Sequence, residues 1–262
     1  AYDPLSRLQS DTRTSGTTSW SYTAASELQQ VVDPSGTSNL TYDASHQLQS
    51  LVTQNPSSVT THSWSYGFNA NGDRTSQSDA ITGNSASFGY DQESRLTSYQ
   101  TGSTTASYGY DGDGLRASKT VNGSAHNQVW DRSGSLPLLL DDGSNQYVYG
   151  PGGLPLEQVT GSSVLFFLQD QLGSTRGMTD SSGSIAGTYT YGAYGQTVLH
   201  TGGATPLQYA GQYTDAESGL QYLRARCYDP STAQFLTVDP ALMLTGDPYG
   251  YAAKCSARWR DT

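Results

Sequence analysis

The sequence predicts an all-β fold, a spiralling antiparallel sheet of stacked β-hairpins, and three observations support it. An aromatic residue followed by a turn recurs at Tyr2, Tyr22, Tyr42, Tyr66, Tyr90 and Tyr110, at intervals of 20, 20, 24, 24 and 20 residues. Such a period is typical of small units that bury their apolar faces against their neighbours. The 29 glycines and 19 tyrosines suit strands and tight turns, and the many Ser and Thr residues weaken helices.

Each repeat opens with a strand in which aromatic and small residues alternate, as in Ser19–Tyr22, Ser63–Tyr66, Ser87–Tyr90 and Ser107–Tyr110. Side chains two residues apart share one face of a strand, so the rings are expected in rows on one face. Turn residues follow at 3–4, 43–45, 69–72, 91–94 and 111–114, and a Leu-containing return strand comes next. One repeat is therefore one hairpin, and six hairpins predict about twelve strands.

The chain divides into three sections on this interpretation. Residues 1–128 form the hairpin array, and residues 129–245 continue the same sheet with a looser period. Alternating aromatics ending in glycine turns, such as 147–153 and 189–195, mark this second section. The tail 246–262 becomes basic and contains Trp259, unlike the residues before it, so a truncated or frame-shifted end is the hypothesis.

Charge and apolar content exclude two classes of partner. The formal net charge is -10 with only 13 Lys and Arg, which argues against binding to nucleic acid or anionic lipid. No apolar run approaches the roughly 18 residues that a membrane span needs. Two cysteines, Cys227 and Cys255, leave two alternatives open: unpaired thiols, which we favour, or a single bridge.

The amino-acid sequences of several segments resemble the RHS/YD-repeat family, including its RHS repeat-associated core region. The segments YDPLSRLQS, YDASHQLQSL, YDQESRLTSY and YGYDGDGLRASK resemble YD repeats. Two longer segments, DQLGSTRGMTDSSG and ESGLQYLRARCYDPSTAQFLTVDP, resemble the two signature blocks of the core. Their signature residues are Asp170, Gly173, Arg176, Tyr222, Arg224, Arg226, Tyr228, Asp229 and Pro230.

The resemblance implies a fold, a partner and a location. In that family the repeats form a spiralling sheet that closes into a hollow shell around a toxic C-terminal effector, and related shells occur in insecticidal toxin complexes and teneurins. The implied partner is therefore an enclosed toxin or effector polypeptide of the full-length protein. The implied location is secreted or at the bacterial cell surface, and no cofactor is implied.

Candidate catalytic residues are few. Bacterial family members end in a self-cleaving element with paired aspartates, and Asp239 and Asp247 resemble its beginning, although its second half is missing here. An aspartyl protease needs two carboxylates that share a proton. We therefore expect Asp239 and Asp247 to act as turn residues. The four histidines share no spacing, so no metal site is expected.

Three function classes remain, and the first is favoured. It is a structural shell fragment that encapsulates or scaffolds an effector without turnover chemistry. The alternative is a surface adhesin, a glycan-binding module or a filament, because unpaired sheet edges recruit further strands and thereby allow self-association. A self-cleaving aspartyl protease is the least favoured of the three.

Overall fold

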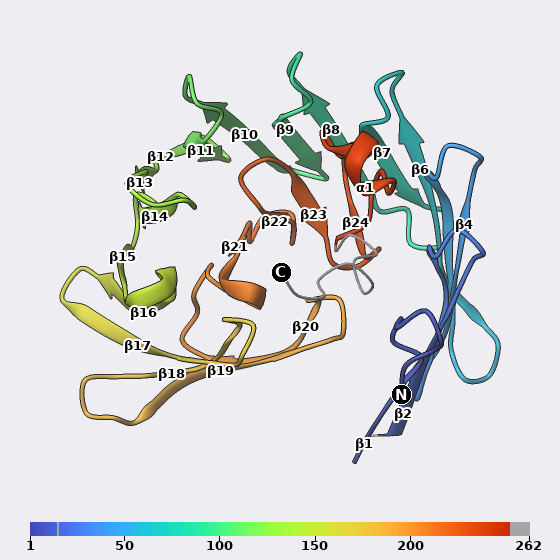
Figure 1. Ribbon diagram of the computed structural model, residues 1–262, viewed down its shortest axis with the longest axis horizontal. Coiled ribbons are helices and arrows are strands. Elements are labelled where there is room, and N and C mark those ends of the chain that lie inside the picture. The colour runs from blue at the N-terminus through green and yellow to red at the C-terminus, as the bar shows by residue number, and fades with distance from the viewer. Residues whose placement is uncertain (15, 252–262) are drawn as a thin grey trace, which may run out of the picture. The chain divides into compact units, whose positions relative to one another are not determined.

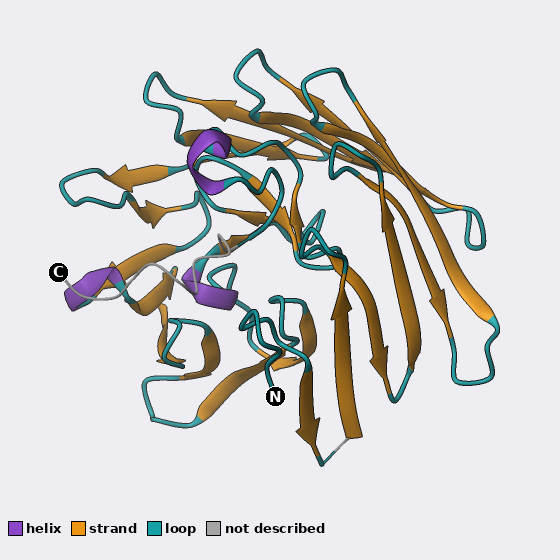
Figure 2. Cartoon of the chain, turned by 45° about the vertical axis from the view of Figure 1, so that its right-hand side comes forward, coloured by secondary structure: helices purple, strands orange, loops and turns teal. Residues whose placement is uncertain are grey.

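The computed structural model describes residues 1–14 and 16–251. These residues are almost entirely antiparallel β-strands joined by short loops, as the colours of Figure 2 show. The predicted all-β class built from hairpins is thereby confirmed. The chain forms two compact units: the first comprises Ala1–Ser94, Gln100–Ser103 and the chain from Thr232 onward, and the second comprises Arg95–Tyr99 and Thr104–Ser231.

The first unit contains eight strands that pair antiparallel in chain order. They are β1 (Ser10–Arg13), β2 (Gly16–Tyr22), β3 (Leu28–Asp33), β4 (Gly36–Tyr42), β5 (Leu48–Gln54), β6 (Thr60–Phe68), β7 (Arg74–Asp79) and β8 (Ser85–Tyr90). The short strand β24 (Gln234–Phe235) and the helix α1 (Leu242–Thr245) also belong to this unit. β9 (Leu96–Thr101) has residues in both units.

The second unit begins with three sequential strands, β10 (Thr104–Tyr110), β11 (Arg116–Val121) and β12 (Ser124–Asn127). An eight-stranded sheet follows in chain order, with β13 (Val129–Asp131), β14 (Leu138–Asp141), β15 (Gln146–Tyr149), β16 (Pro155–Thr160), β17 (Ser163–Gln169), β18 (Thr175–Thr179), β19 (Ile185–Tyr191) and β20 (Thr197–Gly202). The second unit also contains three short strands of a separate sheet: β21 (Tyr213–Thr214), β22 (Gln221–Tyr222) and β23 (Cys227–Asp229). Its 3₁₀ turns are η1 (Pro151–Gly153) and η2 (Tyr209–Gly211).

Helix is as scarce as the composition predicts. In the described part of the chain the only α-helix is the four-residue α1, and no helix is long and apolar enough to cross a membrane. Twelve strands, β1 to β12, lie between residues 10 and 127, which agrees with the number expected from six hairpins.

An aspartate or asparagine closes most of the turns that link these strands. The Asp43 carboxylate accepts the N–H groups of Ser45 and Gln47 at 2.8 and 3.0 Å. Its own N–H donates to the Gln47 carbonyl, and the N–H of His46 donates to the Asp43 carbonyl. His46 has a φ of 65°, in the left-handed region. A short acceptor side chain suits this loop because it satisfies N–H groups that the turn leaves free. The same contacts recur at Asp3, Asn55, Asn69, Asp111, Asp170 and Asp180.

The aromatic residue before the turn connects most hairpins to the hairpin before them. The Tyr42 hydroxyl donates to the Leu28 carbonyl at 2.7 Å, and Leu28 is the first residue of the preceding return strand. Equivalent bonds are Tyr22 to Leu8, Tyr90 to Arg74, Tyr110 to Leu96, Tyr191 to Thr175 and, through the indole N–H, Trp130 to Arg116. The Tyr-Asp pair therefore has two separate roles: the tyrosine bonds sideways and the aspartate closes the turn.

The fourth repeat departs from the predicted series. Phe68, and not Tyr66, occupies the position after the bulge in β6, where it pairs with Arg74 and precedes the turn residue Asn69. Tyr66 lies two pairs earlier, opposite Gln77. With Phe68 in place, the intervals on either side become 26 and 22 residues. An alternating aromatic strand offers two candidates two residues apart, and only the bulge decides between them.

The alternation predicts rows of rings on one face of the sheet. Most of the ring contacts described below instead join a hairpin to residues much later in the chain. Tyr189 and Tyr191 do stack on one face of β19, with ring centres 6.0 Å apart. Other ring pairs join hairpins to the C-terminal third of the chain: Phe68 to Tyr249, Tyr110 to Tyr222, Trp130 to Tyr222 and Tyr191 to Tyr209. The aromatic positions therefore hold this later part of the chain as well as neighbouring hairpins.

Candidate functional site: strand starts that hold extended chain

The start of each return strand carries a backbone N–H that its hairpin partner strand does not use. Around the Tyr2–Leu8 pair, the bonds run from the Asp3 N–H to the Arg7 carbonyl and from the Gln9 N–H to the Ala1 carbonyl. Leu8, between them, directs its own N–H and carbonyl away from Tyr2, as in any non-hydrogen-bonded antiparallel pair. Its carbonyl accepts the Tyr22 hydroxyl at 2.7 Å. The N–H is then available to a ligand.

Arg74 has this position in the first unit, where residues 232–251, the first docked segment, bind to it. The Arg74 N–H donates to the Leu236 carbonyl at 2.8 Å, and its carbonyl accepts the Tyr90 hydroxyl. The guanidinium is fully buried and donates to Thr232 Oγ1 at 3.1 Å. Figure 1 shows the segment in red, with β24 and α1 beside β7 and β8. One residue thus binds the segment through backbone and side chain together.

The first docked segment also rests on the turn before Arg74. The Tyr249 hydroxyl donates to the Gly72 carbonyl at 2.8 Å, and the Phe235 N–H donates to the Tyr249 carbonyl. Gly72 has a φ of 84°, and a Cβ there would lie 2.6 Å from Val238 Cγ2. Glycine is therefore required both by the backbone and by the close approach of the segment. An open groove of about 390 Å³ remains between the segment and the turns at 45–47 and 70–72.

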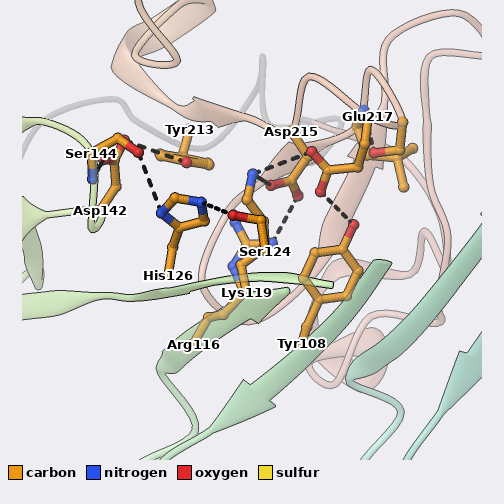
Figure 3. A network of polar contacts seen from close by, with 12 residues as sticks. Tyr108, Arg116, Lys119, Ser124, His126, Asp142, Ser144, Tyr213, Asp215 and Glu217 are labelled. Atoms are coloured by element: carbon orange, nitrogen blue, oxygen red, sulfur yellow. Dashed lines mark hydrogen bonds and ion pairs between the residues drawn. The ribbon is translucent and has the colours of Figure 1, made fainter. Parts of the chain in front are cut away.

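Arg116 has the same position in the second unit, where it binds residues 205–231, the second docked segment. Its guanidinium meets the Asp215 carboxylate at 2.7 Å, and neither side chain is exposed. Lys119 Nζ bridges Asp215 and Glu217 at 3.1 and 3.2 Å. The Tyr108 hydroxyl donates to Glu217 at 2.9 Å. Figure 3 shows these five residues as one network in which two cations meet two carboxylates.

The backbone of Arg116 repeats the geometry of Arg74. Its N–H donates to the Tyr222 hydroxyl at 2.8 Å, and its carbonyl accepts the Trp130 indole N–H at 2.7 Å. The guanidinium carbon lies 4.2 Å from the centre of the Tyr222 ring, a cation–π contact in a desolvated place. Burial raises the pKa of Tyr222 to about 12, so its hydroxyl is neutral at physiological pH.

The charges of this network are stabilised by one another. Burial by itself would lower the pKa of Lys119, but the carboxylates of Asp215 and Glu217 outweigh it and leave that pKa raised. Burial likewise opposes the charge of Arg116, and Asp215 more than restores it, so the pKa of Arg116 is also raised. Burial raises the pKa of Tyr108, with the nearby carboxylates acting in the same direction. The raised pKa values keep Arg116 and Lys119 cationic beside a neutral Tyr108.

A third strand start, Thr175 of β18, binds the second docked segment again. Its N–H donates to the Gln208 carbonyl at 3.1 Å and its hydroxyl to the Leu207 carbonyl at 2.6 Å. Its own carbonyl accepts the Tyr191 hydroxyl. Three strand starts therefore bind a docked segment through their backbone N–H. The acceptor is a backbone carbonyl at Arg74 and Thr175 and the Tyr222 hydroxyl at Arg116.

The predicted core-signature residues take positions around these strand starts. Asp170 and Gly173 form the turn before Thr175, and Gly173 has a φ of 78°. Arg176 Nε lies 3.4 Å from the Asp170 carboxylate. Their contacts indicate a structural role.

The second signature block folds largely on itself and on nearby loops. Arg224 donates to the Pro137 carbonyl at 2.8 Å, and the Arg226 carbonyl accepts the Leu223 N–H. The fully buried Tyr228 donates to the Tyr194 carbonyl at 2.9 Å. Asp229 accepts the N–H of Ser231 and so closes the turn that contains Pro230.

Asp239 and Asp247 both lie in loops of the first docked segment. The Asp239 carboxylate accepts the Ala241 N–H at 2.8 Å and the Thr245 hydroxyl at 3.2 Å. The Asp247 carboxylate accepts the Gly250 N–H at 3.0 Å. These are the contacts of turn-forming aspartates, and a catalytic role for either residue stays a proposal without geometric support.

The histidines and cysteines do not converge. The contacts of the histidines are His46 with Glu27, His62 with Asp79, His126 with Ser124 and Ser144, and His200 with Gly203. Across residues 1–14 and 16–251, no three His, Cys, Asp or Glu side chains could hold a metal ion together. Cys227 is a buried free thiol, and burial raises its pKa to about 12. Cys255 and most of the predicted tail, 252–262, lie outside the described residues.

Sequence reasoning missed the buried arginines, although a signal exists. The residue six positions after the strand-end aromatic is Leu8, Leu28, Leu48 and Leu96 in four repeats. It is Arg74 after Phe68 and Arg116 after Tyr110. Arginine in place of leucine at this position marks the repeats of the array whose strand starts bind the docked segments.

Known proteins share sequence similarity with this chain and its Tyr-Asp repeats. Residues 139–248 match the family model described as Teneurin YD-shell. The chain is 33% identical over 150 residues to the tRNA3(Ser)-specific nuclease WapA of Bacillus spizizenii. The matched region covers 53% of this chain and 6% of WapA. It is also 33% identical over 91 residues to the toxin protein Tse5 of Pseudomonas aeruginosa, covering 34% of this chain and 7% of Tse5. Over residues 139–248 the chain is therefore similar to the Teneurin YD-shell family, in agreement with the RHS/YD-repeat resemblance of its sequence.

A solved structure supports the fold of this YD-repeat chain. The crystal structure of TcdB2-TccC3-Cdc42 superposes with a TM-score of 0.51 at 17% sequence identity, over 97% of this chain and 18% of that chain. The YD-repeat chain thus spans a small part of each of these three proteins. The likeness to the solved structure concerns the arrangement of strands.

Proposed function

We propose that this YD-repeat chain is part of the wall of a β-shell that encloses or scaffolds an effector polypeptide and performs no turnover chemistry of its own. The observation that carries the proposal is the repeated binding of a later segment of polypeptide at strand starts. Arg74, Arg116 and Thr175 each donate a backbone N–H to a docked segment. Hairpins that bind extended polypeptide in this way suit a wall whose partner is another stretch of chain.

The relatives supply the partner class. WapA is named a nuclease and Tse5 a toxin, and the matched repeats make up only 6% and 7% of those proteins. In our proposal the toxic activity resides in a separate effector, which is the enclosed partner. We propose that the protein is secreted or lies at the bacterial cell surface, as the family resemblance implies. The net charge of -10 makes nucleic acid a poor ligand for the wall itself.

Limited proteolysis tests the enclosure. The chain is expressed together with the sequence that flanks it in its parent protein and digested with subtilisin, and fragments are identified by intact mass. The proposal expects the effector region to survive in the native protein and to be cut faster in an Asp215→Ala variant. Asp113→Ala, at a side chain that is 70% exposed, is the matched control. An effector region cut as fast in the native protein as in urea would overturn the proposal.

Self-association through a sheet edge is the second candidate, and one observation favours it. All six residues of β20, at the end of the eight-stranded sheet, are exposed, including Val198 at 66% and Leu199 at 58%. β20 carries no charged residue. The edge strand β1, in contrast, is short and carries the ion pair between Arg13 and Asp11. Charges on an edge strand discourage pairing with another chain, and their absence permits it.

Sedimentation velocity separates the two candidates. Self-association through β20 expects concentration-dependent species that disappear in Val198→Lys and persist in Thr12→Lys, a change on β1, an edge strand of a different sheet. A monomer at all concentrations would exclude the filament. Burial of many tyrosines, among them Tyr108, Tyr147 and Tyr189, gives a glycan platform less support than either candidate.

A further inference from the structure

We propose that the strand-start N–H groups of Leu8 and Leu28 bind a further extended segment of apolar polypeptide. This inference rests on the proposed role of the chain as a wall and names the surface and the ligand. Leu8 and Leu28 stand six residues after Tyr2 and Tyr22, as Arg74 stands six residues after Phe68. All three strand starts belong to the first unit.

Leu8 presents its N–H without an acceptor in the described part of the chain. The bonds on either side run from Asp3 to Arg7 and from Gln9 to Ala1, so the Tyr2–Leu8 pair itself contains none. The Leu8 carbonyl is already bonded by the Tyr22 hydroxyl. This is the arrangement of Arg74 with its ligand removed.

Leu28 repeats the arrangement. The Thr23 N–H donates to the Glu27 carbonyl, which makes Tyr22 and Leu28 a pair without mutual hydrogen bonds. On its other side, the ladder between β3 and β4 begins only at Gln30. The Leu28 carbonyl accepts the Tyr42 hydroxyl at 2.7 Å. Neither ladder therefore uses the Leu28 N–H.

The occupied strand starts identify the ligand atom. Arg74 binds the carbonyl of Leu236 and Thr175 binds the carbonyl of Gln208, so the ligand atom is a backbone carbonyl. The side chain at the strand start then selects the class of segment. Arg74 and Thr175 each add a polar bond from their side chains. Leucine offers none, so Leu8 and Leu28 favour a segment with apolar side chains and no charge.

The two free sites continue an interface that exists already. The first docked segment extends from Arg74 to the next turn, because Val238 and Tyr249 line a groove together with His46 and Gln47. The strand start after that turn, Leu48, is fully buried. Leu28 and Leu8 follow at successive intervals of twenty residues and are half-buried. A second segment placed there would extend the same row of contacts.

Residue-resolved amide exchange tests the proposal on the whole chain. The probe is a synthetic peptide with the sequence of residues 232–238, acetylated and amidated, because this uncharged sequence contains the Leu236 carbonyl that binds Arg74 in the structure. We expect saturable shifts of the Leu8 and Leu28 amide resonances. Their exchange should slow by about 1 + [peptide]/Kd, or about tenfold at ten times the Kd. A peptide with serine at the positions of Phe235 and Leu236 is the matched control.

A Leu28→Pro variant removes one N–H together with its signal, so that site is read at the neighbouring Gln29 amide, whose peptide-induced shift should disappear while Leu8 keeps its response. Unchanged exchange at both amides in the native chain would overturn the proposal, as would an equal response to the serine peptide. The outcome is separable from the proposed function. Protease protection of the effector with no peptide response rejects only these two sites, and a peptide response without protection rejects only the enclosure.

Discussion

Arg116 and Asp215 lie 99 residues apart in the chain, yet their side chains meet at 2.7 Å with neither exposed to solvent. Taking both charges out of water is costly, and the cost is recovered only when the two side chains meet in good geometry. The pair therefore specifies where the second docked segment binds on β11. A segment shifted by one residue would leave a buried charge without its partner.

Replacing Asp215 with alanine should destabilise the second unit strongly. The change leaves the guanidinium of Arg116 buried without its counter-ion, which typically costs about 3–5 kcal/mol. Urea unfolding followed by circular dichroism measures the loss. Asp113→Ala, which removes an exposed partner of Arg132, should cost about 1 kcal/mol or less. Equal losses for the two variants would mean that the buried pair has no special weight.

Replacing Tyr42 with phenylalanine should weaken the link between adjacent hairpins. The Leu28 carbonyl loses its hydroxyl donor, and a hydrogen bond of this kind contributes about 0.5–1.5 kcal/mol. Tyr2→Phe is the control because Tyr2 is 71% exposed, and it should leave the urea midpoint unchanged. A midpoint for Tyr42→Phe equal to that of the native chain would show that the hydroxyl bond does not hold the hairpins together.

Replacing Gly72 with alanine should dislodge the first docked segment. The new Cβ would lie 2.6 Å from Val238 and 2.7 Å from the Tyr249 hydroxyl, in addition to the strain of a positive φ. Gly83→Ala has a similar φ of 74° and nothing within 4 Å, so it reports the backbone cost alone, about 1 kcal/mol. We expect a clearly larger loss for Gly72→Ala, with faster amide exchange at Phe235. Matching losses in the two variants would speak against a close fit at Gly72.

Alkaline pH should destabilise the protein through its buried tyrosines. Burial raises the pKa of Tyr222 and Tyr249 to about 12, above the value of about 10 in an unfolded chain. Groups whose pKa rises on folding contribute their full stability below the unfolded pKa and lose it as the pH rises through the folded pKa. Urea midpoints should therefore fall between pH 10 and pH 12, together with a rise in absorbance at 295 nm. Constant midpoints over this range would contradict the burial of these hydroxyls.

Asp239 should not cleave the chain. Its carboxylate is engaged by the Ala241 N–H and the Thr245 hydroxyl, as expected of a turn residue before proline. The intact mass of the folded protein should stay unchanged over days at pH 4 to 8. Cleavage near Asp239 that disappears in Asp239→Asn would restore the protease hypothesis.

The repeating half of the fold was predictable because its signals are local. Each Tyr-Asp step determines a strand end and a turn within about six residues, and the composition excludes competing helices. The position of Phe68 was not predictable from alternation, since Tyr66 satisfies the same two-residue pattern. The bulge that selects Phe68 depends on the pairing of β6 with β7.

The docked segments were beyond sequence reasoning for a different physical reason. Contacts such as Arg74 with Thr232 join residues 158 positions apart, and no local pattern encodes their partner. A polar residue at a strand start indicates that something binds there. Only the folded structure shows which carbonyl accepts the strand-start N–H, and at Arg74 it is the carbonyl of Leu236.

The hydroxyl of each strand-end tyrosine finds its acceptor in the hairpin that precedes it in the chain. Assembly consequently has a direction. A hairpin emerging from the ribosome or from a secretion channel meets a template that is already complete, and its tyrosine can bond at once. Growth from the amino terminus can therefore proceed hairpin by hairpin, and the buried guanidinium groups of Arg74 and Arg116 meet Thr232 and Asp215 only when the later segments arrive.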